Sequence, residues 1–126
     1  MAVYKHANPT AIAGTLVFDP ASDATDDSDG DNVTAASSGS VYLVQIDNSK
    51  NKSTAAYVKI IDASSATPGS STPAFVFYAP AKKVVTYQLP AGHAYSAGVS
   101  FWCSTGAGRT NTTNPVSAVK VRILAS

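Results

Sequence analysis

Short runs of hydrophobic residues alternate with polar ones along most of the chain, and each run ends in turn-forming residues. Alternation with a period of two is typical of a strand that buries one of its faces. From position 40 onward such runs recur about every ten residues, a spacing typical of all-β domains. The pattern predicts strands at residues 11–18, 41–47, 54–62, 73–79, 83–89, 95–104 and 117–124.

The segments between these runs indicate how the strands connect. The NSKNKS segment at residues 48–53 predicts a hairpin between the two strands that flank it, and the PAG segment at 90–92 predicts another turn. The Asp-Pro step at 19–20 predicts the end of the first strand, because proline donates no ladder hydrogen bond. About seven or eight such strands are most stable as two antiparallel sheets packed face to face. The predicted fold is therefore all-β, a single antiparallel β-sandwich of Ig-like or jelly-roll type.

Composition favours strands and turns over helices. All eight acidic residues are Asp, and Ala, Ser and Thr are abundant while Leu and Met are scarce, which argues against a helical bundle. A chain of 126 residues with 44% hydrophobic content has the size of one domain. Within that domain we distinguish an N-terminal arm and first strand at residues 1–18, an Asp/Ser/Thr-rich loop at 19–40, and the sandwich core at 41–126.

Charge and cysteine content exclude several classes of protein. A net charge of +1 with scattered basic residues argues against binding to nucleic acid or to an anionic membrane. Cys103 is the single cysteine, so an intrachain disulfide framework is excluded. The N-terminus lacks the apolar region of a secretory signal, and no run is long enough to span a membrane. We therefore expect a soluble protein that is made in the cytosol.

The loop at residues 19–40 contains a cluster of carboxylates that could bind a hard cation such as Ca²⁺. When Gly30 is placed at the invariant glycine of an EF-hand loop, Thr25 and Ala36 occupy the two anchoring positions, and neither carries a carboxylate. A solvated acidic loop remains the alternative, and we predict neither a metal nor a cofactor. The carboxylates belong to Asp23, Asp26, Asp27, Asp29 and Asp31.

Candidate catalytic groups do not form a constellation typical of an enzyme. His6 and His93 lie far apart in the sequence and lack the paired spacing of zinc ligands. Cys103 shares a strand face with hydrophobic residues, which predicts a buried apolar side chain rather than a thiolate nucleophile. Asp47 and Asp62 fall at strand ends beside turns, and no G-x-S-x-G motif occurs. We therefore predict no enzymatic activity and no catalytic residues.

Aromatic residues suggest one alternative function. β-Sandwiches that bind carbohydrate stack sugar rings on exposed aromatic side chains, whereas aromatic residues inside strands more often pack in the core or between subunits. The exposure of Trp102 separates these interpretations, because a buried indole cannot stack on a sugar. The candidate aromatics are Tyr42, Tyr57, Tyr78, Tyr87, Tyr95 and Trp102.

From residue 41 onward, a series of short motifs resembles small virion proteins of tailed bacteriophages. The motifs are IDNS at 46–49, YVK at 57–59, LPAG at 89–92, SAGVS at 96–100 and TGA at 105–107. The resemblance covers about two thirds of the chain and departs from the family pattern at Trp102, Cys103 and Arg109. Residues 1–40 match no pattern of this family.

The resemblance implies a structural component of a virion and supplies no catalytic residues. The expected role is a capsid decoration (cement) protein that stabilises the head by binding between capsid subunits, or else a component of the neck or tail. The expected partners are the major capsid protein or other virion proteins, and further copies of the chain itself, a trimer being the form that threefold capsid positions favour. The expected location is the capsid surface of the virion, after synthesis in the host cytoplasm.

The first 40 residues contain the predicted interaction residues. The side chains of Tyr4, Ile12, Leu16 and Val17 suit an arm that docks on a neighbouring subunit or adds a strand to an exposed sheet edge. Asp27 and Asp29 represent the acidic loop, which we expect to be ordered by subunit contacts.

Overall fold

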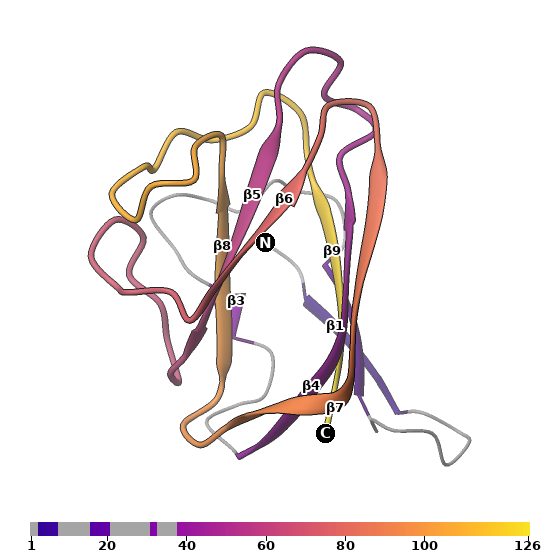
Figure 1. Cartoon of the computed structure of the whole chain (residues 1–126), viewed down its shortest axis with the longest axis vertical. Coiled ribbons are helices and arrows are strands. Elements are labelled where there is room, and N and C mark those ends of the chain that lie inside the picture. Colours follow the sequence, from indigo (N-terminus) through magenta and orange to yellow (C-terminus); the bar gives the residue numbers. More distant parts are fainter. Residues whose placement is uncertain (1–2, 8–15, 21–30, 33–37) are drawn as a thin grey trace.

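The computed structural model describes residues 3–7, 16–20, 31–32 and 38–126, with side chains from residue 38 onward (Figure 1). The described residues form nine strands and no helix. The strands are β1 (Val3–Ala7), β2 (Leu16–Pro20), β3 (Asp31–Asn32), β4 (Gly39–Asp47), β5 (Ala56–Asp62), β6 (Phe75–Ala79), β7 (Val84–Tyr95), β8 (Val99–Ser104) and β9 (Lys120–Ala125).

The strands form two antiparallel sheets that face each other across a shared core (Figure 1). One sheet has the order β1-β2-β9-β4-β7, and the other has the order β3-β8-β5-β6. The predicted all-β class with two antiparallel sheets is therefore confirmed. The number of described strands differs from the predicted number.

The strands pair in a nested order. β5 pairs with β6, β4 with β7, β3 with β8 and β2 with β9, so each pair encloses the previous one in the sequence. This is the order of one long hairpin wrapped around a common core, and the β4–β9 and β5–β8 pairings join its parts into sheets. The predicted hairpin across residues 48–53 is wrong. β4 and β5 lie in opposite sheets, because the segment between them crosses from one sheet to the other.

The predicted turn at residues 90–92 is also wrong, because β7 continues through it as a strand of 12 residues. The register between β4 and β7 shifts opposite Tyr42, so that residues 89–92 form a bulge in β7. Gly92 adopts a φ of +77°, and a Cβ at this position would lie 2.8 Å from Cε1 of Tyr42. Pro90 is tolerated because β7 is an edge strand.

The core consists mainly of alternating residues from both sheets. Val121 and Ile123 of β9 are buried, as the alternation predicts. β8 is buried along both faces. Cys103 belongs to the hydrophobic core cluster, which confirms its predicted role. Trp102 is fully buried as well, and the Nζ of Lys59 lies 5.7 Å from the centre of its ring.

The first predicted strand ends where the sequence indicates. Residues 11–15 lie outside the described residues, and β2 ends at Pro20, so the predicted strand end at the Asp-Pro step is confirmed, although β2 includes these two residues. Phe18 is the last residue of β2 that pairs with β9, and Pro20 lies beyond it, opposite Val3 of β1. Because Pro20 does not face β9, the N–H that proline lacks is not needed for the hydrogen bonds between β2 and β9.

The segment predicted as a loop at residues 19–40 also contains strand structure. Asp31 and Asn32 form β3 and lie opposite Phe101 and Ser100 of β8. β4 begins at Gly39, two residues earlier than the predicted strand. The first 40 residues thus contribute strands to both sheets, because β1 and β2 belong to one sheet and β3 to the other.

Candidate interaction surface

The structure describes the backbone at three of the predicted interaction residues, Tyr4 in β1 and Leu16 and Val17 in β2. The other three, Ile12, Asp27 and Asp29, lie outside the described residues. β1 pairs with β2, and β2 pairs with β9 of the same chain. Docking of this arm on a neighbouring subunit stays a prediction.

Two sheet edges run side by side along one side of the sandwich. β6 forms an edge of one sheet and β7 an edge of the other, and the hydroxyl of Tyr87 on β7 donates a 2.5 Å hydrogen bond to the carbonyl of Tyr78 on β6. An edge strand presents N–H and C=O groups that can pair with another chain. Among the described strands, none lies beyond β6 in its sheet or beyond β7 in the other.

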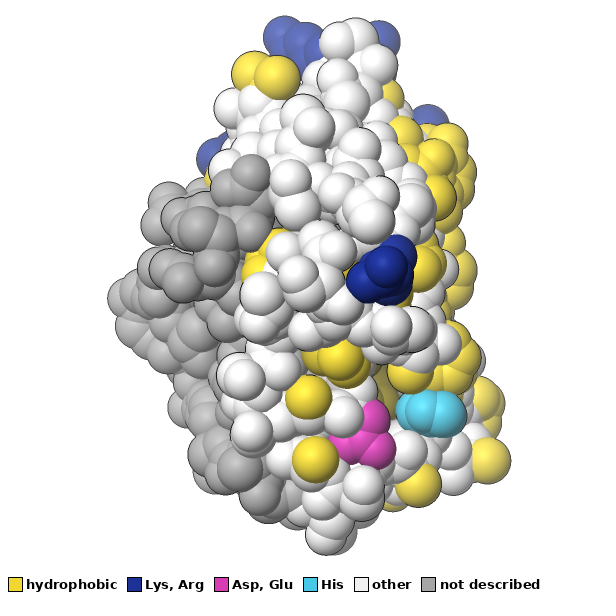
Figure 2. All heavy atoms as spheres, turned by 90° about the vertical axis from the view of Figure 1, so that its left-hand side faces the viewer, with side chains coloured by type: hydrophobic (Ala, Val, Ile, Leu, Met, Phe, Trp, Pro, Cys, Tyr) yellow, Lys and Arg dark blue, Asp and Glu magenta, His cyan; other side chains and the backbone are white. Residues whose placement is uncertain are grey.

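Exposed hydrophobic side chains follow these two edges. Val76 is 43% exposed, Tyr78 45% and Val84 52%, and the only other large hydrophobic side chain this exposed within residues 38–126 is Val116. We call Val76, Tyr78 and Val84 the apolar edge surface. Figure 2 shows hydrophobic side chains along most of the right-hand margin of the molecule, below the basic side chains at its top. Val76 and Tyr78 share the outer face of β6, opposite the core residue Phe77, and exposed hydrophobic groups that lie together in this way mark a site of protein contact more often than scattered ones.

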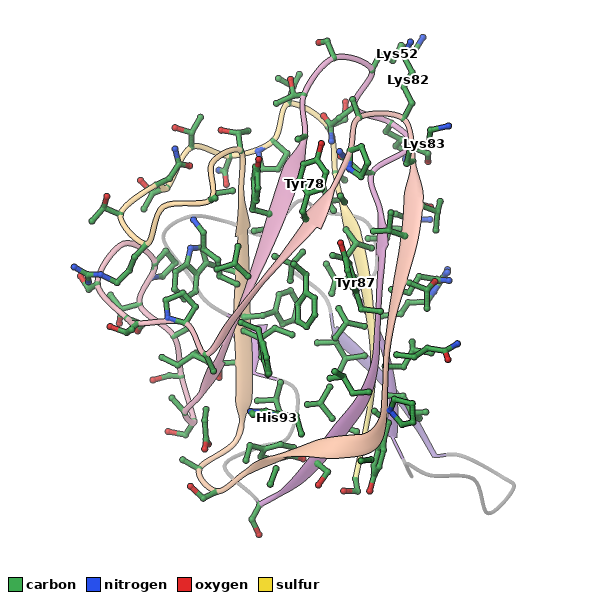
Figure 3. All side chains as sticks on the ribbon, in the orientation of Figure 1. Lys52, Tyr78, Lys82, Lys83, Tyr87 and His93 are labelled. Carbon is green, nitrogen blue, oxygen red and sulfur yellow. The ribbon has the colours of Figure 1, made fainter. Side chains whose placement is uncertain are left out.

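Aromatic rings fix the shape of this side of the molecule. The ring of Phe77 on β6 lies 4.9 Å from that of Tyr87 on β7, and the ring of Phe75 meets His93 edge-on at 4.4 Å. Figure 3 shows Tyr78 and Tyr87 nearer one end of this side and His93 nearer the other. Contacts between the two sheets therefore hold both edges in a defined geometry.

The candidate sugar platform is not formed around Trp102, because this side chain is 0% exposed. Tyr95 is also buried. Tyr57 and Tyr78 lie 5.3 Å apart, but their rings are tilted by 45° and do not offer one flat surface. Burial of Trp102 is the observation that counts most against the carbohydrate-binding alternative.

Lys59 fixes the loop that follows β8. Its Nζ donates hydrogen bonds to the hydroxyl of Ser104 at 2.6 Å and to the carbonyls of Gly108 at 2.7 Å and Asn111 at 3.1 Å. The side chain is fully buried, and this burial lowers the pKa of its ammonium group from the ordinary value of 10.5. Three oxygen acceptors compensate for part of the cost of burying the charge.

A pair of buried asparagines joins three loops at one end of the sandwich. The amide of Asn48 donates to the carbonyls of Thr54, Ala79 and Pro80. Asn51 donates to Asn48 Oδ1 at 2.8 Å and exchanges two hydrogen bonds with the backbone of Ser117. The loops at residues 48–55, 80–83 and 112–119 are therefore held in one fixed arrangement.

Four exposed lysines project from two of these loops. Lys50 and Lys52 flank Asn51, whose carbonyl accepts a 2.9 Å hydrogen bond from the N–H of Lys82. Lys83 follows Lys82 and accepts a hydrogen bond from the N–H of Asn48. We call Lys50, Lys52, Lys82 and Lys83 the lysine end. Figure 3 shows three of these side chains, Lys52, Lys82 and Lys83, together at one extremity of the molecule.

Lys82 has an unusual backbone conformation. Its φ is +68°, the left-handed region that a residue with a Cβ rarely adopts, and it is the one non-glycine residue with positive φ among the described residues. Glycine or asparagine would be the ordinary choice at such a turn position. The chain therefore keeps a lysine where the backbone favours another residue.

The two carboxylates in residues 38–126 stabilise turns, as their positions at strand ends predict. The hydroxyl and amide of Ser49 donate to Asp47, which lowers the pKa of Asp47, and the nearby charges of Lys120 and Arg122 act in the same direction. Asp62 accepts hydrogen bonds from the backbone N–H groups of Ser96 and Ala97, which lower its pKa. Both acids therefore have structural partners.

Metal-ligating side chains do not gather in the described part of the chain, which contains no group of three His, Cys, Asp or Glu side chains that could hold a metal ion. A hollow lined by Asp47, Ser49, Lys50 and Lys120 has a volume of about 30 Å³, whereas small-molecule sites usually have about 300–1,000 Å³. Within the described residues, no helix is long and apolar enough to cross a membrane.

The sequence matches no family model, and neither a curated protein nor a solved structure matches it. Function must therefore be argued from the surfaces of the molecule. Sequence reasoning missed both the apolar edge surface and the lysine end. The KNK segment at residues 50–52 and the KK pair at 82–83 were visible signals for the lysine end, but their proximity depends on the fold.

Proposed function

We propose that this chain is a non-enzymatic structural protein of a bacteriophage virion, a capsid decoration or cement protein that stabilises the head by binding between capsid subunits. The observation that supports this proposal is the apolar edge surface, in which Val76, Tyr78 and Val84 lie exposed on two neighbouring sheet edges. A passive binding role needs such a contact surface and no catalytic group.

The nested strand pairing supports a sandwich of the jelly-roll type, in which one long hairpin wraps into two sheets. Viral capsid and lectin domains are built in this way. The fold is therefore compatible with a virion protein, but function has to be argued from the surface.

The size of the apolar edge surface fits a contact that depends on many copies. Its three side chains are about half exposed, so covering each one contributes roughly 1 kcal/mol. Edge hydrogen bonds and surrounding contacts add to this value. A protein held by contacts of this strength is retained well when several copies or several contacts act together.

Co-sedimentation tests the proposal. The protein is followed from its native source through a dense cushion with virus-sized particles, and copies per particle are counted by quantitative mass spectrometry. Copy numbers in the hundreds support a capsid decoration protein, whereas about a dozen copies indicate the alternative, a neck or tail component. Absence from particles refutes the virion proposal.

Two matched variants test the surface itself. Val84→Asp places a charge in the apolar edge surface, and Val116→Asp places the same charge on the other exposed valine, which lies outside β6 and β7. We expect Val84→Asp to lower occupancy of the particle by at least about tenfold, because a carboxylate in an apolar contact is costly to desolvate. Val116→Asp should bind like the wild type. Equal occupancy by both variants would show that the particle is bound through another surface.

A further inference from the structure

Charge is divided unequally along the chain. Six of the eight Asp residues lie in the first 37 residues, together with a single Lys. The remaining residues contain eight of the nine Lys and Arg residues and only two Asp. The net charge of +1 is therefore the sum of an acidic segment at residues 1–37 and a basic segment at residues 38–126.

The basic charge is concentrated at the lysine end. Its four ammonium groups come from two loops that the buried Asn48 and Asn51 hold together. Of the two Asp residues in 38–126, Asp47 lines a hollow together with Lys50 of the lysine end, whereas Asp62 is bound to the turn at Ser96 and Ala97. The backbone that carries the lysine end is thus held in one arrangement, and lysines on fixed loops lose less entropy on binding an anion than lysines on mobile loops.

Lys82 provides a second observation that points to a ligand. Its left-handed backbone conformation is unfavourable for a residue with a Cβ, and strained residues of this kind occur preferentially at binding sites. A lysine at this unfavourable backbone position is explained if binding requires its positive charge.

We propose that the lysine end binds the acidic segment at residues 21–30 of a second copy of this chain. That segment carries four carboxylates, on Asp23, Asp26, Asp27 and Asp29, which match the four ammonium groups of the lysine end. The lysines are exposed in the single chain, so the end is open to another copy. The proposed function adds one condition to this contact, because a virion would bring neighbouring copies of the chain close together.

Acidic protein fits the lysine end better than nucleic acid. The two loops that carry the lysines contain no aromatic residue on which a base could stack and no Arg. The acidic segment in the same chain would also repel phosphate. A contact between two different surfaces of the same protein is heterologous, and it closes into a ring or continues as an open chain.

Peptide binding to the full-length protein tests the proposal. The probe is a fluorescent peptide of residues 21–30, and its anisotropy is measured at about 0.01 M and about 1 M salt, where the Debye length is roughly 30 Å and 3 Å. We expect binding that is lost at high salt and absent for a peptide in which the four Asp are replaced by Asn. Absence of binding at low salt overturns the proposal.

Charge-matched variants locate the site. Lys52→Gln/Lys82→Gln removes two charges from the lysine end, and Lys5→Gln/Arg109→Gln removes two charges elsewhere. We expect the first pair to weaken peptide binding about tenfold and the second to weaken it less than about twofold. Equal weakening by both pairs means that only net charge matters, and the proposal fails.

Two further measurements exclude the other occupants. Sedimentation equilibrium of the full chain should show self-association that rises with concentration and disappears at high salt, whereas a monomer at all concentrations would overturn binding to a second copy. An oligothymidylate of about ten nucleotides should bind more weakly than the peptide, and the reverse order would assign the lysine end to nucleic acid. None of these assays uses particles, so their outcome is independent of whether the protein co-sediments with virions.

Discussion

Replacing Lys82 by glycine should stabilise the fold. The φ of +68° places this residue in the left-handed region, which costs a residue with a Cβ about 1–2 kcal/mol. Glycine avoids this cost but loses about 0.5–1 kcal/mol through the greater freedom of the unfolded chain. Because the backbone hydrogen bond from Lys82 to Asn51 is retained, we expect a net gain of about 0.5–1 kcal/mol and a Tm that is higher by roughly 2–4 °C.

Two control variants isolate the effect of the backbone. Lys83→Gly removes the same side chain at a neighbouring position without positive φ, so it should lower stability by about 0.5–1 kcal/mol. Lys82→Ala removes the charge but keeps the Cβ, so it should not show the gain of Lys82→Gly. Urea unfolding followed by the fluorescence of Trp102 measures all three. Equal destabilisation by Lys82→Gly and Lys83→Gly would refute the interpretation that Lys82 is strained.

Three other perturbations follow from the contacts described above. Lys59→Met should destabilise the fold by about 2–4 kcal/mol, because three buried or partly buried acceptors lose their donor. The same change should make residues 105–111 sensitive to protease. Thermal unfolding measures the loss of stability, and limited proteolysis measures the exposure of the loop. The folded-state pKa of Asp62 is below its ordinary value of 3.8, so its stabilising effect is complete above that pH and is lost as the pH falls through the folded pKa. Unfolding of Asp62→Asn as a function of pH should therefore depend less on pH in this acidic range, and an unchanged slope would contradict the assignment. Gly92→Ala should lower the free energy of unfolding, measured with denaturant, by about 2 kcal/mol. The new Cβ would lie 2.8 Å from Tyr42, and residue 92 has a left-handed backbone conformation. A neutral effect would show that the bulge can shift.

The sequence predicted local structure well where one face of a strand is buried. The alternation at residues 119–123 identified inward-facing Val119, Val121 and Ile123, and the pattern around Cys103 identified a core residue. The positions of Asp47 and Asp62 at strand ends identified their contacts with turns. The partner of Asp47 is Ser49, two residues away, and the burial of the hydrophobic side chains follows from the period of the strand. The turn that binds Asp62 lies 34 residues away, so the position at a strand end indicated a turn contact but not its partner.

The way in which loops and strands distant in the sequence come together could not be predicted in the same way. A polar segment such as residues 48–53 can close a hairpin or cross between sheets, and the choice depends on the buried Asn48 and Asn51, whose partners extend to Ser117. The burial of Trp102 likewise involves a residue distant in the sequence, because the Nζ of Lys59 on β5 lies 5.7 Å from the centre of its ring. The lysine end escaped prediction for the same reason, since its two loops are adjacent only in the folded chain.

The nested pairing also determines when the protein can fold during synthesis. β9 is the last of the nine strands to be made, yet it lies between β2 and β4 inside its sheet. Until β9 emerges, the edges of β2 and β4 that it will occupy are open, and open edges are where nascent chains pair wrongly. The sheet can therefore close only after residues 120–125 have been made, and before that point its open edges expose the nascent chain to wrong pairing.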